Sequence, residues 1–153
     1  MKSTFASFVL ATALVQPASA ITFPSLTTIY VGAGVTDSGG AAGVGTATAF
    51  HCINVSGVTT SVRFVVLSGG GSAVASFTRA IAHGATATAS THSTSAYAAN
   101  DLNTGLVSQG GINIESLQSG VFCNAMTIDA ASGVPTGVTL PLVRVNPHPG
   151  TVE

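Results

Sequence analysis

The chain has very little charge and no tryptophan. Only 6% of its 153 residues are Asp, Glu, Lys or Arg, against about a quarter in an average soluble domain. Its one lysine is Lys2, and the remainder of the chain carries three arginines and five acids, a net charge of −2. Such sparse charge does not attract phosphate backbones or anionic lipid, so neither nucleic acid nor a membrane surface is an expected partner.

Long apolar runs are also missing, except at the N-terminus. The first residues, "MKSTFASFVLATALVQPASA", combine one cation, a short apolar stretch and small residues ending at Ala20, which is typical of a secretory signal peptide with an A-x-A cleavage site. The apolar stretch is about half of the roughly 20 residues that span a bilayer. We therefore expect a signal peptide over 1–20, one domain over 21–153, and a secreted or periplasmic protein without membrane insertion after cleavage.

Helical periodicity is nearly absent. Short stretches rich in β-branched residues alternate with Gly, Ser, Asn and Asp clusters, a pattern that predicts an all-β protein. In "SVRFVVL" the apolar residues Val62, Phe64 and Val66 share one face of a strand. The fold class that we expect is an immunoglobulin-like antiparallel β-sandwich of about 7–9 strands, with one helical turn allowed at "TSAYAANDL". The predicted strands cover 26–35, 47–55, 61–67, 73–81, 85–93, 112–116, 120–129 and 138–145.

The chain has only two cysteines, Cys52 and Cys123, each within a predicted strand. In an exported protein, pairing is the default state of two cysteines. We therefore predict a Cys52–Cys123 disulfide, which joins either the two sheets or two strands of one sheet.

Two resemblances follow from these residues. Cysteines in the second and next-to-last strands resemble the inter-sheet bridge of immunoglobulin-like sandwiches, although tryptophan is absent and Val121 stands where that family has a tyrosine. From Thr27 to Glu153 the chain also resembles small exported bacterial proteins with a cysteine-paired β core, an "NIES" strand and a tail like "LVRVNPHPGTVE". The second resemblance implies fold and export but no chemistry. It also implies that the "NVS" sequon at Asn54 is unused, a reading that a eukaryotic source would reverse.

A metal site is the alternative use of the two cysteines. A blue-copper site needs a thiolate, two imidazoles and usually a weak methionine ligand, and the chain offers Cys123, Met126 and four histidines. No histidine lies between Cys123 and Met126, however, and a disulfide would consume the thiolate. Met126 is therefore expected to fill the core. For zinc, His51 and Cys52 would point to opposite faces of one strand. We expect no metal and no cofactor.

Catalytic motifs are similarly weak. The chain has no G-x-S-x-G element, and its glycine-rich stretches lack the spacing of phosphate-binding loops. Its five acids are scattered, with Asp37 and Asp101 in expected loops. Glu115 and Asp129 are the one pair that could converge as catalytic carboxylates, and the plainer interpretation is that both are solvent-facing strand charges. We expect no catalytic residues and a protein that is not an enzyme.

A binding role then depends on loops at the ends of the sandwich. The segment "THSTSAYAANDLNTG" combines one aromatic ring with several hydrogen-bonding groups that could recognise a sugar or a peptide, the alternative being a solvated loop. In the tail, about 146–153, two prolines flank His148 and favour an extended chain. The sequence thus predicts an exported, non-enzymatic β-sandwich with a structural or binding role toward an unknown protein or glycan, the alternative being a cupredoxin-like metal-binding or hydrolytic secreted domain. The candidate binding residues are His92, Tyr97, Asn100, Asp101 and Asn103.

Overall fold

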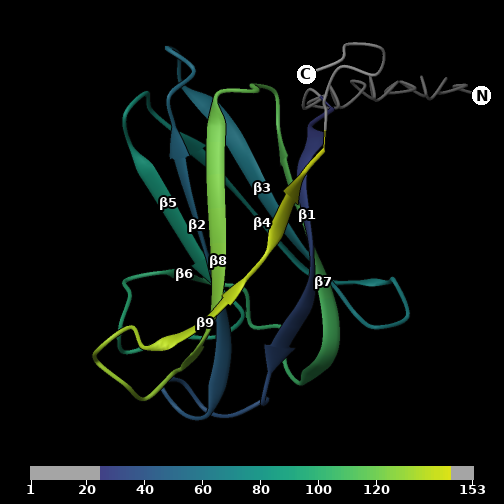
Figure 1. Ribbon diagram of the computed structural model, residues 1–153, viewed down its shortest axis with the longest axis vertical. Coiled ribbons are helices and arrows are strands. Elements are labelled where there is room, and N and C mark those ends of the chain that lie inside the picture. Colours follow the sequence, from purple (N-terminus) through teal and green to yellow (C-terminus); the bar gives the residue numbers. More distant parts are fainter. Residues whose placement is uncertain (1–24, 146–153) are drawn as a thin grey trace, which may run out of the picture.

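The computed structural model describes residues 25–145, which form ten strands and contain no helix (Figure 1). The predicted signal peptide and the tail from residue 146 lie outside the described residues. Nothing in the described part of the chain forms a helix long and apolar enough to cross a membrane. The strands are β1 (Thr27–Asp37), β2 (Thr46–Asn54), β3 (Thr60–Leu67), β4 (Ala73–Ile81), β5 (Thr86–Ser90), β6 (Asn100–Asp101), β7 (Val107–Ser116), β8 (Val121–Asp129), β9 (Gly137–Leu140) and β10 (Leu142–Arg144).

The strands form two five-stranded sheets that pack face to face (Figure 1). Sheet A has the order β10-β1-β7-β3-β4, and sheet B has the order β6-β5-β2-β8-β9. All neighbouring strands are antiparallel except β5 and β6. This arrangement confirms the predicted all-β sandwich.

The core lies between the sheets and follows the alternation that the sequence shows. Val62, Phe64 and Val66 of β3 are fully buried, while the residues between them are only partly covered. Ile112 and Ile114 of β7 face the same core, and Phe64 meets Phe50 of sheet B with ring centroids 6.3 Å apart. Alternate burial of β-branched and aromatic side chains drives these strands into one layer against another.

The disulfide joins two strands of the same sheet. Cys52 in β2 and Cys123 in β8 are direct cross-strand partners in sheet B, with a Cα–Cα distance of 4.1 Å. Their bond confirms the predicted pairing. The sequence left open whether the disulfide joins the two sheets or two strands of one sheet, and the structure shows the second arrangement. Immunoglobulin-like domains have the first arrangement, so the resemblance to them does not extend to the disulfide.

One predicted strand is in fact two. The sequence predicts a single strand over 138–145. In the structure Pro141 separates β9, which pairs with β8 in sheet B, from β10, which pairs with β1 in sheet A. A proline has no N–H to donate and ends a ladder. The ribbon from β9 to β10 therefore crosses between the layers and closes one side of the sandwich (Figure 1).

Arg144 stabilises this closed side. Its guanidinium lies over the ring of Phe122 in β8 at 4.9 Å and over the ring of Tyr30 in β1 at 5.6 Å. It also donates hydrogen bonds to the Tyr30 hydroxyl and to the Ser119 carbonyl. One arginine thus links β10 to both sheets.

The sequon residue Asn54 is part of the structural core. Its side chain is fully buried, and its amide Nδ2 donates to the carbonyls of Val58 and Ile81 at 2.7 and 2.8 Å. Its Oδ1 accepts from the N–H and hydroxyl of Ser56. Because the nitrogen that would carry a glycan is enclosed and doubly bonded, the folded chain cannot present this sequon.

Candidate functional site

The candidate loop runs from the end of β5 to the start of β7 and is firmly attached to sheet B. Thr91 and Thr48 exchange hydrogen bonds, and the Ser95 N–H donates to the Ala130 carbonyl. Further along, the Leu102 N–H donates to the Ser90 carbonyl, and the Leu102 side chain is 8% exposed. The helical turn expected at 94–102 is not formed, because the backbone here bonds to neighbouring strands rather than to itself. The loop covers one part of sheet B instead of standing free in solvent.

The five predicted binding residues do not converge on one surface. The Asn100 side chain donates to the Thr88 carbonyl, and Asp101 accepts from the Asn103 N–H. Asn103 adopts a positive φ of 49°, which asparagine tolerates better than most residues. These three residues therefore shape the loop. His92 and Tyr97 belong to two separate clusters.

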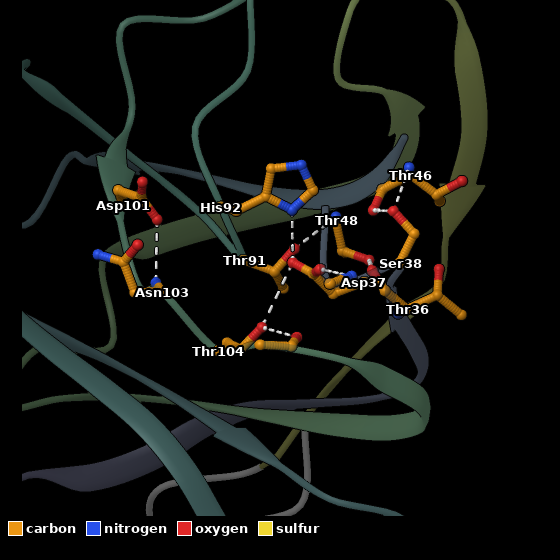
Figure 2. Close-up of polar contacts among 12 residues, drawn as sticks. Thr36, Asp37, Ser38, Thr46, Thr48, Thr91, His92, Asp101, Asn103 and Thr104 are labelled. Atoms are coloured by element: carbon orange, nitrogen blue, oxygen red, sulfur yellow. Dashed lines mark hydrogen bonds and ion pairs between the residues drawn. The ribbon is translucent and has the colours of Figure 1, made fainter. Parts of the chain in front are cut away.

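His92 forms a buried pair with Asp37 at the end of β1. Figure 2 shows the His92 ring aimed at the Asp37 carboxylate, with the Nδ1 to Oδ2 distance at 2.7 Å. The Gly39 N–H donates to the other carboxylate oxygen at 2.7 Å, and the Thr104 hydroxyl approaches Oδ2 at 3.4 Å. Both partners are nearly fully buried. The pair ties the β1–β2 turn to the candidate loop.

The environment keeps Asp37 ionised. Burial by itself would raise the pKa of the Asp37 carboxyl, but hydrogen bonds from His92, Thr91 and the Gly39 N–H outweigh it and lower that pKa below its usual value. Since the carboxylate can only accept, His92 donates from Nδ1. The other ring nitrogen, Nε2, is buried and has no hydrogen-bond partner among the described residues.

Tyr97 belongs to the second cluster, on the outer face of sheet B. Its ring packs edge-on against His51 of β2 at a centroid distance of 4.5 Å, and its hydroxyl donates to Met126 Sδ of β8 at 3.2 Å. A thioether is a weak acceptor, so a better acceptor could take this hydrogen bond. His51 is held by a hydrogen bond between Nδ1 and the Thr88 hydroxyl at 3.1 Å.

The surface beside Tyr97 is hollowed into what we call the sheet B groove. It consists of two adjoining hollows of about 310 and 270 Å³ that share His51 and Asn124. Its lining is uncharged, since amide, hydroxyl and imidazole groups alternate with apolar side chains. The residues that line it beyond the disulfide are His51, Ile53, Thr86, Tyr97, Phe122, Asn124, Ala125, Met126 and Thr139.

A larger hollow of about 410 Å³ lies on the outer face of sheet A. Backbone and small apolar side chains line most of it, and Asn113 is its one polar side chain. It therefore offers little to orient a polar ligand.

Sequence reasoning missed most of the groove. It placed His51 opposite Cys52 across the strand, and the structure agrees, because Cys52 is in the core and His51 faces outward. It assigned Met126 to the core, whereas Met126 lines the groove. The available signal was the alternation of polar Asn124 with Phe122 and Met126 along one face of β8.

The described residues contain no cluster of three or more His, Cys, Asp and Glu side chains able to hold a metal ion. Cys123, the thiolate of the copper alternative, is bonded to Cys52. Glu115 pairs with Arg63 in sheet A, while Asp129 accepts from the Ala131 N–H at the end of β8 in sheet B. These two acids therefore do not face one another.

The burial of His51 predicts how the free energy of unfolding depends on pH. Burial lowers the pKa of His51, so the folded chain keeps it neutral while the unfolded chain gains a proton below about pH 6.5. Stability contributed by neutral His51 is therefore lost as pH falls from about 6.5 toward the lower folded pKa, with a slope of at most about 1.4 kcal/mol per pH unit. We expect His51→Gln to flatten the decline in urea midpoint between pH 7.5 and 5, and an unchanged slope would contradict this assignment.

Comparison with protein-family models, with curated proteins and with solved structures finds no match for this chain. The geometry of the sandwich and its groove is therefore the basis for a functional assignment.

Proposed function

We propose that this chain is an exported, non-enzymatic β-sandwich that binds a neutral carbohydrate in the sheet B groove. The observation that carries the proposal is the uncharged groove, in which Tyr97 and Phe122 flank the amide of Asn124. Sugars present apolar C–H faces and hydroxyls together, so aromatic rings and an amide with both donor and acceptor groups match them. The lining residues carry no charge, and the Arg144 guanidinium that lies over Phe122 already donates to Tyr30 and Ser119, so the groove favours a neutral ligand.

The groove is rigid enough to bind without large ordering costs. Its floor consists of paired residues of β2 and β8, including Ile53 opposite Phe122 and His51 opposite Asn124. The ring of Phe122 is 51% exposed yet held on one side by Arg144. Pre-positioned side chains lose less conformational entropy on binding. The residues from Phe122 to Met126 extend over about 14 Å of strand, room for a short oligosaccharide.

Export is supported by two features. The N-terminal sequence has the pattern of a signal peptide, and the Cys52–Cys123 disulfide is compatible with an oxidising compartment outside the cytoplasm.

Tyrosine fluorescence provides a direct test. The chain has no tryptophan and two tyrosines, and Tyr30→Phe leaves Tyr97 as the only strong fluorophore. After a screen on an array of neutral oligosaccharides, we expect the best binder to change Tyr97 emission in a saturable titration. Tyr97→Ala and Asn124→Ala should each weaken binding, measured by calorimetry, by at least about tenfold.

The matched control is Asn113→Ala, which removes an amide from the outer face of sheet A and should leave affinity unchanged. The proposal is refuted if no neutral oligosaccharide binds, or if binding survives both groove variants.

A hydrolase is the second candidate, and the Asp37–His92 pair is the observation that favours it. A histidine oriented by a carboxylate is the base of a Ser-His-Asp triad. Here, however, the free Nε2 is buried, and no hydroxyl among the described residues is bonded to it. Hydrolysis of an acyl ester, the chemistry of such a triad, that is lost in Asp37→Asn while carbohydrate binding is retained would favour this candidate over simple binding.

A further inference from the structure

The four edges of the sandwich differ greatly in length. Sheet A ends in β10 and β4, and sheet B ends in β6 and β9. Three of these strands have two to four residues, whereas β4 has nine. An edge strand leaves a row of N–H and C=O groups without strand partners. Within residues 25–145 no strand pairs with the outer side of β4.

β4 has few of the features that protect natural edges. It contains no lysine, proline or glycine, and its one irregularity is a bulge at Val74, which lies between residues paired with Leu67 and Val66. The stretch Ala75–Ile81 beyond the bulge pairs regularly with β3. Seven regular residues remain open on one side, more than any other edge of the described sandwich offers.

The side chains of Ala75–Ile81 are complementary to those of the same stretch in a second copy of the chain. In an antiparallel pairing of two copies centred on Thr78, residues whose numbers add to 156 lie opposite each other. Phe77 then faces Arg79 of the second copy, and Thr78 faces its own equivalent. Arg79 is exposed and forms no ion pair or hydrogen bond among the described residues, so its guanidinium is free to cover the partly buried ring of Phe77.

We propose that two copies of this chain pair through β4 around a two-fold axis at Thr78, joining their A sheets into one continuous sheet. Aromatic–cation contacts and threonine pairs across strands both favour this register. No like charges lie directly opposite each other, because Arg79 is the only charged residue of β4.

The proposed pairing of two β4 strands ends at the dimer and does not continue into a larger assembly. A two-fold interface uses the same surface on both copies, and the sandwich formed by residues 25–145 has one long edge strand, β4. Once two β4 strands have met, the remaining edge strands have two to four residues and cover parts of β1, β5 and β8. None of the edges left open has a regular stretch as long as Ala75–Ile81, so they offer little template for further addition. The expected product is a dimer and not a fibre. This assembly leaves the sheet B groove free and does not depend on what that groove binds.

Charge variants test both the dimer and its register. Ser76 and Ala80 are exposed and lie opposite each other across the proposed axis. In one copy they are four residues apart, about 14 Å, and their β3 neighbours Val65 and Ser61 are uncharged. The double variant Ser76→Lys with Ala80→Lys sets like charges opposite each other twice, whereas Ser76→Lys with Ala80→Glu sets opposite charges in the same places.

We expect sedimentation velocity of the purified protein to give twice the chain mass. The double-lysine variant should raise the dimer dissociation constant at least about tenfold, and the lysine–glutamate variant should retain or strengthen the dimer. Circular dichroism confirms that each variant is folded. A wild-type chain that stays monomeric at its highest soluble concentration overturns the proposal, as does a dimer that responds equally to both variants.

Discussion

Replacing Cys52 and Cys123 together by alanine is expected to lower the free energy of unfolding by about 4 kcal/mol. The bridge joins residues 71 positions apart, and closing a loop of this size removes about that much entropy from the unfolded chain at 25 °C. A typical domain is stable by only about 5–15 kcal/mol, so the loss is a large share of the total. Urea unfolding followed by circular dichroism measures it.

The position of the disulfide makes the origin of its stabilising effect testable. β2 and β8 pair along their whole length, from Thr46 to Asn54, so the bond lies within a long antiparallel ladder. The stabilisation should then act through the unfolded state, and reduced wild-type protein should match the double alanine variant in both midpoint and slope. A loss below about 1 kcal/mol would show that the unfolded chain is already compact across this loop.

The features that the sequence predicts best are local. The alternation in "SVRFVVL" places Val62, Phe64 and Val66 in the core, and the segment Ala73–Ile81 is a strand over the predicted range. Each depends on residues two positions apart, because successive strand side chains point to opposite faces. Turn residues then separate the strands. Fold class follows from these short-range signals.

The features that the sequence leaves open depend on which strands become neighbours. The pairing of the cysteines is predicted, but whether they share a sheet depends on the placement of β2 beside β8, strands whose cysteines are 71 positions apart. Pro141 in the sequence indicates where a strand ends. That the chain then crosses from sheet B to sheet A depends on how the two sheets pack, which the sequence pattern does not contain.

Prediction of the candidate site from the sequence is limited in the same way. Tyr97 is identifiable as a surface aromatic residue, but its neighbours His51 and Met126 come from strands 46 and 29 positions away. Asp37 was assigned to a loop and not to His92, from which it is separated by 55 positions. Periodicity carries no information about such long-range contacts, so only three-dimensional packing reveals them.

Asp37→Ala is expected to destabilise the fold by about 3–5 kcal/mol, because it removes one partner of a buried pair and leaves the other without compensation. The carboxylate also accepts from the Gly39 N–H, so the β1–β2 turn and the candidate loop lose a shared anchor. Asp37→Asn keeps the size of the side chain and should cost less. Urea unfolding at pH 7 measures both variants.

The effect of acid separates an ionic role of Asp37 from a role in packing. The folded-state pKa of Asp37 is lowered, so its stabilising contribution is present above the unfolded value of about 3.9 and is lost as pH falls below that value through the folded pKa. Wild type should therefore lose more stability than Asp37→Asn between pH 5 and 2. Parallel declines would assign Asp37 a packing role alone.

The loop itself gives the decisive readout. Amide hydrogen exchange should accelerate in Asp37→Asn at Gly39, Ser95 and Thr104, whose N–H groups bond within or beside the pair. It should stay slow at Phe64 in the core of sheet A, which the pair does not touch. Because the same loop carries Tyr97 to the sheet B groove, looser anchoring at His92 should also weaken the proposed carbohydrate binding. A variant that opens the loop but leaves that affinity intact would show that Tyr97 is positioned by its own contacts with His51 and Met126 and not by the distant Asp37–His92 pair.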